Sequence, residues 1–131
     1  MVKRFSDAYH TVILRPSTSI VYVARSAVPF ASTEDVERHF QALGQALSEL
    51  DRSKLDLLID IRAVTGRNDP EFESAIAPHR AGVQRGFRRV AFLVNSAAGQ
   101  LQVQRHARQD GTTARAFQDE KSALDWLSVE P

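Results

Sequence analysis

The chain contains no cysteine. This absence excludes disulfide bonds, thiolate metal sites and cysteine nucleophiles. Only four histidines are present, and none has a second histidine or a glutamate at the spacing of a metal-binding helix. We therefore expect no metal and no other cofactor, and we interpret the histidines as structural or surface residues: His10, His39, His79 and His106.

Long apolar runs are also absent. No segment approaches the roughly 18–20 apolar residues that span a bilayer, and the opening residues MVKRFSDAYH lack the apolar region of a secretory signal. Hydrophobic residues make up 43% of the chain and charged residues 25%, as in an ordinary globular protein. We predict one domain over residues 1–131, without a membrane span, in the cytoplasm.

The net charge is small, +1, but it is unevenly distributed. Residues 79–115 carry seven arginines against the single acid Asp110, a net charge of +6, whereas residues 33–60 carry −4. Such polarity allows two copies to associate head to tail, so a homodimer is one predicted partner, but we favour the simpler interpretation of a solvated surface on which the charges happen to segregate. The basic run lacks the aromatic series of an RNA-binding sheet, and we predict no nucleic-acid partner.

In the first half of the chain, the spacing of apolar residues changes once, from a pattern typical of strands to one typical of a helix. Residues 8–15 and 19–26 are rich in β-branched and aromatic side chains and are separated by the turn composition Pro16-Ser17-Thr18, which predicts an antiparallel hairpin. Ser32 then caps a helix of about 18 residues. One apolar stripe marks this helix: Val36, Phe40, Leu43, Leu47 and Leu50.

The second half alternates strands and helices. Residues 54–64 are apolar on both faces, which is typical of a parallel strand covered on both sides, and residues 88–94 and 113–117 are further strands. Residues 95–111 are ambiguous because QLQVQ alternates like a strand, but a parallel neighbour requires a crossover, so we favour a helix. A closing helix is predicted over residues 119–128.

The helix after the central strand has clear start and stop signals. Asp69 is a suitable N-cap with Pro70 at the first helical position, and Gly86 is a suitable C-cap. Pro78 lies inside this helix, so we expect a kink or break near Ala77. The resulting order, ββαβαβαβα, predicts an α/β fold with a mixed sheet of about five strands and helices packed on it.

This pattern resembles a known family. The long first helix, the strand and loop LLIDIRAVTG, the Asp-capped second helix, VAFLV (90–94) and ARAFQDEKSALDWL (114–127) together resemble STAS-like domains, notably the stand-alone bacterial proteins related to anti-sigma-factor antagonists. The resemblance covers residues 8–128. It implies a STAS-like fold, related to that of CRAL-TRIO lipid-binding domains, and a regulatory function exerted through protein contacts.

One departure from that family affects the function. The resemblance implies a phosphorylatable serine at the start of the second helix, but Asp69 and Pro70 stand there and no hydroxyl is present. Thr65, the only hydroxyl in the loop, lies at its beginning. We therefore expect a module that lacks the usual phosphorylation site.

The candidate interaction site consists of two loops that follow neighbouring parallel strands, where open α/β sheets usually place their sites. Arg67 is the predicted anchor, Asn68 an orienting group and Asp69 a cap that fixes the helix. The full set is Thr65, Arg67, Asn68, Asp69, Asn95 and Ser96. The partner would be an unidentified protein.

Two other functions remain as alternatives. The first is a carrier or sensor of a lipid or other small apolar ligand, with a cavity lined by Phe72, Ile76, Phe87 and Trp126. The second is a hydrolase using Ser96 at a strand-to-helix turn. The glycines of a nucleophile elbow and an ordered His–Asp pair are missing, so we predict that the protein is not an enzyme.

Overall fold

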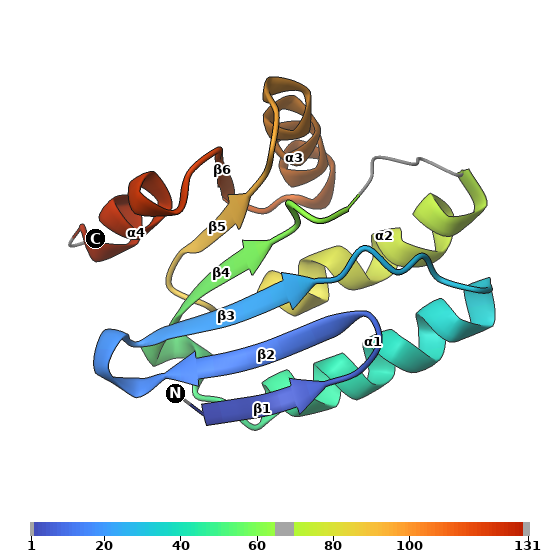
Figure 1. Cartoon of the computed structure of the whole chain (residues 1–131), viewed down its shortest axis with the longest axis horizontal. Coiled ribbons are helices and arrows are strands. Elements are labelled where there is room, and N and C mark those ends of the chain that lie inside the picture. The colour runs from blue at the N-terminus through green and yellow to red at the C-terminus, as the bar shows by residue number, and fades with distance from the viewer. Residues whose placement is uncertain (1, 65–69, 130–131) are drawn as a thin grey trace.

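The computed structural model describes residues 2–64 and 70–129, and Figure 1 shows their arrangement. Its strands are β1 (Val2–Ser6), β2 (His10–Arg15), β3 (Ile20–Arg25), β4 (Asp56–Asp60), β5 (Val90–Leu93) and β6 (Arg115–Phe117). Its helices are α1 (Thr33–Ser48), α2 (Pro70–Gln84), α3 (Ala97–Asp110) and α4 (Glu120–Ser128). Short 3-10 turns span Pro16–Thr18 and Arg52–Lys54.

The strands form one mixed sheet in the order β1-β2-β3-β4-β5-β6. Strand β2 pairs antiparallel with both β1 and β3. Strands β3, β4, β5 and β6 pair in parallel, each with the next. The predicted α/β class and the hairpin are confirmed, with six strands in the described residues rather than about five. The missed strand is β1, whose register shifts between Lys3 and Phe5 and whose two adjacent basic residues hide the alternation.

The crossovers explain which face of the sheet each helix covers. Each step from β3 to β6 moves to the next strand in the same direction, and right-handed crossovers then place all three connecting helices on one face. A core of side chains from β2 to β5 and from α1 lies on that face, including Val23, Leu43 and Ile59. Helix α4 covers the opposite face, where Ala123 and Leu127 pack on Leu58.

Helix α2 is continuous across Pro78, so of the kink or break predicted near Ala77 the break does not occur. Pro78 lacks one N–H and cannot make its own helical hydrogen bond, yet the helix continues to Gln84. Two contacts support its second half: α2 packs along α1, and the Arg52 guanidinium donates to the backbone oxygens of Gly82, Val83 and Arg85. These carbonyls at the helix end are left without helical partners, so a cation there is favourable.

Two of the remaining helices, α1 and α3, begin at serine N-caps. The Ser32 hydroxyl accepts the Asp35 N–H at 3.1 Å, and α1 follows. The Ser96 hydroxyl accepts the Gly99 N–H at 3.0 Å, which starts α3 and resolves the ambiguity over residues 95–111 in favour of a helix. Gly111 ends α3 with a φ of 70°, a left-handed conformation that glycine adopts at little cost.

Candidate functional site

A cavity of about 620 Å³ lies between the helix-covered face of the sheet and helices α1, α2 and α3. Ligand pockets typically measure roughly 300–1,000 Å³. Its walls include Arg25 and Ser26 at the end of β3, Ile61 and Val64 after β4, and Phe92 on β5. The cavity therefore reaches the carboxyl ends of the parallel strands, the edge at which open α/β sheets bind ligands.

Most of the lining is apolar and comes from every element around the cavity. The sheet contributes Val23, Ile59 and Phe92, and α1 contributes Phe40 and Leu43. Helices α2 and α3 add further apolar side chains: Phe72, Ile76, Val83, Val103 and Ala107. Such a wall favours an apolar ligand body, because burying its surface removes that surface from water.

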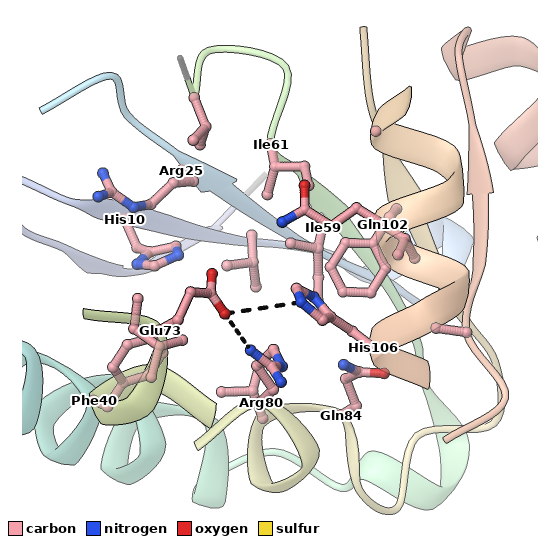
Figure 2. Close-up of a pocket in the computed structure, with 18 of the residues that line it drawn as sticks. His10, Arg25, Phe40, Ile59, Ile61, Glu73, Arg80, Gln84, Gln102 and His106 are labelled. Atoms are coloured by element: carbon pink, nitrogen blue, oxygen red, sulfur yellow. Dashed lines mark hydrogen bonds and ion pairs between the residues drawn. The ribbon is translucent and has the colours of Figure 1, made fainter. Parts of the chain in front are cut away.

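A polar network joins α2 to α3 on one side of the cavity. The Arg80 guanidinium donates to Glu73 at 3.0 Å and to Asp110 at 2.9 Å. His106 Nε2 lies 3.8 Å from the same Glu73 carboxylate. Figure 2 shows dashed lines from the Glu73 carboxylate to both Arg80 and His106. Burial lowers the pKa of His106, and nearby Arg80 lowers it further. The network links α2 and α3 along that side of the cavity.

A second polar group lies at the hairpin end of the cavity. His39 Nδ1 lies 2.5 Å from Asp7 Oδ2, and His39 Nε2 lies 2.6 Å from His10 Nδ1. The two imidazole planes differ by 10° and their centroids are 4.7 Å apart, as expected for rings that meet nitrogen to nitrogen. Asp7 Oδ1 also accepts the backbone N–H groups of Tyr9 and His10. Asp7, His39 and His10 thus form a continuous chain, which we call the Asp7–His39–His10 chain.

Burial determines the charge state of this chain. His10 is 8% exposed and His39 is 4% exposed. Burial, helped by His39 and Arg25, lowers the pKa of His10 to about 3. Burial also lowers the pKa of His39, although Asp7 opposes the change. Burial raises the pKa of Asp7, but its hydrogen bonds outweigh this and hold it below the usual value. At neutral pH the Asp7–His39–His10 chain therefore consists of one carboxylate and two neutral imidazoles.

Arg25 stands directly opposite His10. The two residues are register partners of β3 and β2, so their side chains lie on the same face of the sheet, and Figure 2 shows both beside the cavity. The Arg25 guanidinium lies 4.6 Å from the Phe30 ring centre and donates to the Ser26 carbonyl oxygen. Burial lowers the pKa of Arg25. No ion pair within residues 2–64 and 70–129 includes it.

Two further polar atoms of the cavity wall have unused hydrogen-bonding capacity. Gln84 Oε1 and Thr112 Oγ1 are buried and have no hydrogen-bond partner among the described residues. Both residues line the cavity. A polar atom buried without a partner costs free energy, so a bound molecule or water that satisfies these atoms would be favoured.

The predicted interaction residues are only partly placed. Thr65, Arg67, Asn68 and Asp69 lie outside the residues that the structure describes. Asn95 donates from its amide nitrogen to the Arg62 carbonyl oxygen at 2.9 Å, so the loops after β5 and β4 do meet.

The predicted cavity lining is half right. Phe72 and Ile76 line the cavity. Phe87 instead packs in the core beneath the helices, and Trp126 lies with α4 on the opposite face of the sheet. The prediction for these two residues is wrong, because an apolar residue near a helix end or on the last helix gives no sign of which face it covers.

The polar residues of the cavity leave no pattern in the sequence. Each histidine stands alone there, whereas the structure brings His10 and His39 together from positions 29 residues apart. Within the described residues, no group of three or more acidic, histidine or cysteine side chains is placed to hold a metal ion. None of the described helices is long and apolar enough to cross a membrane.

Comparisons with known proteins agree on the fold. The SpoIIAA-like family model matches residues 27–128. A similar solved structure is the 2.25 Å crystal structure of an uncharacterized protein from the DUF3478 family, with a SpoIIAA-like fold, from Shewanella loihica PV-4. It is 24% identical, covers 94% of this chain and 98% of its own, and has a TM-score of 0.61, so it shows the fold alone. A search of curated proteins found no match.

Proposed function

The chain belongs to the SpoIIAA-like family, and we propose that it is a non-enzymatic regulatory module that holds a small apolar or amphipathic ligand in its cavity. The SpoIIAA-like fold suggests a module of the anti-sigma-factor-antagonist kind. The observation that carries the ligand proposal is the 620 Å³ cavity with an apolar wall and a few polar groups. That combination is what small-molecule sites share.

We call the predicted interaction residues Thr65, Arg67, Asn68, Asp69, Asn95 and Ser96 the rim, and its described residue Asn95 lies at the edge of the sheet that the cavity reaches. Val64 lines the cavity, and Asn95 bonds to the Arg62 carbonyl oxygen two residues before it. We propose that a partner protein contacts this rim and so responds to whether the cavity is filled. Arg67 and Asn68 remain the proposed anchor and orienting group of that contact.

The ligand proposal is tested by filling the cavity from α3. Ala107 is 9% exposed and lines the cavity, whereas Leu101, on the same helix, is 61% exposed and does not. Ala107→Phe places a ring in the cavity, and Leu101→Phe is the matched control. Titration with dodecan-1-ol should show one ligand bound per chain and an affinity at least tenfold lower in Ala107→Phe than in the control. Equal affinities in the two variants would contradict binding in this cavity.

The choice of readout follows from the position of the tryptophan. Trp126 packs beside Phe117 on the face of the sheet that α4 covers. Its fluorescence is therefore a poor reporter of the cavity, which lies on the other face. Calorimetry and native mass spectrometry detect the ligand directly and avoid this difficulty.

A further inference from the structure

The Asp7–His39–His10 chain determines which nitrogen of each imidazole carries the proton. A neutral imidazole has one N–H donor and one bare acceptor nitrogen. Asp7 is ionised and can only accept, so His39 must place its proton on Nδ1 to fill the 2.5 Å contact. His39 Nε2 is then bare. The 2.6 Å contact between the rings therefore requires the His10 proton on Nδ1.

The result is a bare nitrogen at the cavity. His10 lines the cavity, its Nδ1 is occupied by His39, and among the described residues its Nε2 has no hydrogen-bond partner. Because His39 sits among aromatic rings and its side chain is 2% exposed, it cannot easily rotate to another partner. The nitrogen that His10 offers to the cavity is thus fixed as an acceptor, and it needs a donor.

Arg25 supplies the complementary half of the site. Its guanidinium is a donor only, it is register partner to His10, and no carboxylate of the described residues lies within ion-pair distance of it. A head group that suits the pair offers one O–H to His10 and a second oxygen to Arg25. An undissociated carboxylic acid has this arrangement, with its hydroxyl and carbonyl oxygens on one carbon.

We propose that His10 and Arg25 form a subsite for the carboxylic acid head of an amphipathic ligand, and that Asp7 and His39 are positioning residues that hold His10 in the accepting tautomer. This proposal rests on the proposed function, because the apolar chain of such a ligand would occupy the cavity. Its apolar neighbours near this end include Phe30, Phe40 and Val23.

The proposal implies that the ligand binds together with a proton. A free carboxylic acid is ionised at neutral pH, and an ionised head would face the lone pair of His10. Whether the proton finally lies on the ligand or on His10, one proton enters with each carboxylate. The titratable and charged groups around His10 are Asp7, Tyr9, Arg25 and His39, and those on the other side of the cavity are Glu73, Arg80 and His106.

The tautomer is tested first, in the free protein. Nitrogen-15 NMR of the imidazoles distinguishes a protonated nitrogen from a bare one. We expect His10 and His39 each to be protonated on Nδ1 and bare on Nε2 at pH 7. His39→Gln should release His10 into a mixture of tautomers while the fold is retained. A wild-type His10 that carries its proton on Nε2 would overturn the proposal.

Binding is tested with two probes that differ only at the head group, dodecanoic acid and methyl dodecanoate. The ester keeps the chain and the carbonyl but lacks the O–H. In the wild type the acid should bind at least tenfold more tightly than the ester at pH 6. Its binding should take up about one proton, measured by calorimetry in two buffers with different ionisation enthalpies.

The variant His10→Phe removes the acceptor and keeps an aromatic ring in its place. It should bind acid and ester with affinities within about twofold of each other, because neither head group then finds the acceptor. Saturable binding of the ester by this variant shows that the cavity is intact, and the control Leu101→Phe, outside the cavity, should keep the tenfold preference for the acid. Equal binding of acid and ester by the wild type, or an acid preference that survives in His10→Phe, would overturn the subsite and leave the ligand cavity standing. Failure of both probes to bind would overturn the cavity as well.

Discussion

At the residue scale, the buried histidines are the most informative feature of the protein. His10 and His39 are held neutral by burial and linked to the Asp7 carboxylate. Ring contacts with Tyr9 and Phe40 surround His39. Buried polar groups are costly unless they are hydrogen-bonded. The Asp7–His39–His10 chain provides hydrogen bonds for three of the four imidazole nitrogens and leaves His10 Nε2 facing the cavity.

This burial predicts how stability depends on pH. The pKa of His10 is about 3 in the folded protein against 6.5 in the unfolded chain, so below pH 6.5 the unfolded state binds a proton that the folded state does not. Stability is therefore lost as pH falls from 6.5 towards 3. Between pH 7 and pH 5, His10 alone should lower the free energy of unfolding by about 2 kcal/mol.

Urea denaturation at the two pH values measures this effect. The pKa values of His39 and His106 are also lowered, so they change stability in the same direction. His10→Phe removes the largest of these contributions and should show a smaller difference between pH 7 and pH 5 by about 1–2 kcal/mol. A variant with the same pH dependence as the wild type would contradict the buried, neutral state of His10.

At the element scale, ion pairs rather than close packing join α2 to α3. Arg80 bridges Glu73 on α2 and Asp110 on α3, and its side chain is 17% exposed. In contrast, Lys121 and Asp125 form an exposed pair within α4. Since exposed ion pairs contribute little, the bridge and the α4 pair offer a matched comparison.

Arg80→Met should leave Asp110 without its arginine and Glu73 with His106 alone, and cost about 1–3 kcal/mol of stability. Lys121→Met should cost less than about 1 kcal/mol. Hydrogen exchange should also speed up in α2 and α3 of the Arg80 variant and stay unchanged in the Lys121 variant. Similar losses in both variants would show that the bridge is no stronger than a surface pair.

The two described residues of the predicted rim have different structural roles. Ser96 caps α3, whereas the Asn95 side chain makes one exposed hydrogen bond to a neighbouring loop. Ser96→Ala should therefore lower the free energy of unfolding by about 0.5–2 kcal/mol. Asn95→Ala should change it by about 0.5 kcal/mol or less. Thermal denaturation distinguishes the two, and a larger loss for Asn95→Ala would refute these roles.

Most helices and strands of the protein are predictable from its sequence. The Ser32 cap and the apolar stripe that begins at Val36 predict α1, because both signals are local. Parallel strands show as runs that are apolar on both faces, as for β4. The limits are also physical: Pro78 is tolerated because α1 and Arg52 support α2, and these contacts come from distant parts of the chain.

At the scale of the whole molecule, three of the seven clustered arginines make internal polar contacts. Arg80 bridges two helices, Arg88 pairs with Asp56 at 3.3 Å, and Arg89 donates to the Trp126 carbonyl oxygen. Part of the positive charge of residues 79–115 is thus used to connect helices and strands to one another. The head-to-tail homodimer remains a prediction.

The cavity is the feature that sequence predicts least well. Phe72 and Ile76 were expected to line it, but the same residues would serve equally in an ordinary close-packed core. Whether side chains from α1, α2, α3 and the sheet meet or leave a space depends on how the helices are spaced, which no local pattern encodes. The Asp7–His39–His10 chain is hidden for the same reason.

The central claim is that this cavity holds a small molecule, and native mass spectrometry of protein purified from its own host tests it most directly. A filled cavity should add the mass of one small molecule under native conditions, the added mass should disappear on denaturation, and Ala107→Phe should lack it. A bare polypeptide under native conditions, both as purified and after incubation with dodecanoic acid, would contradict it.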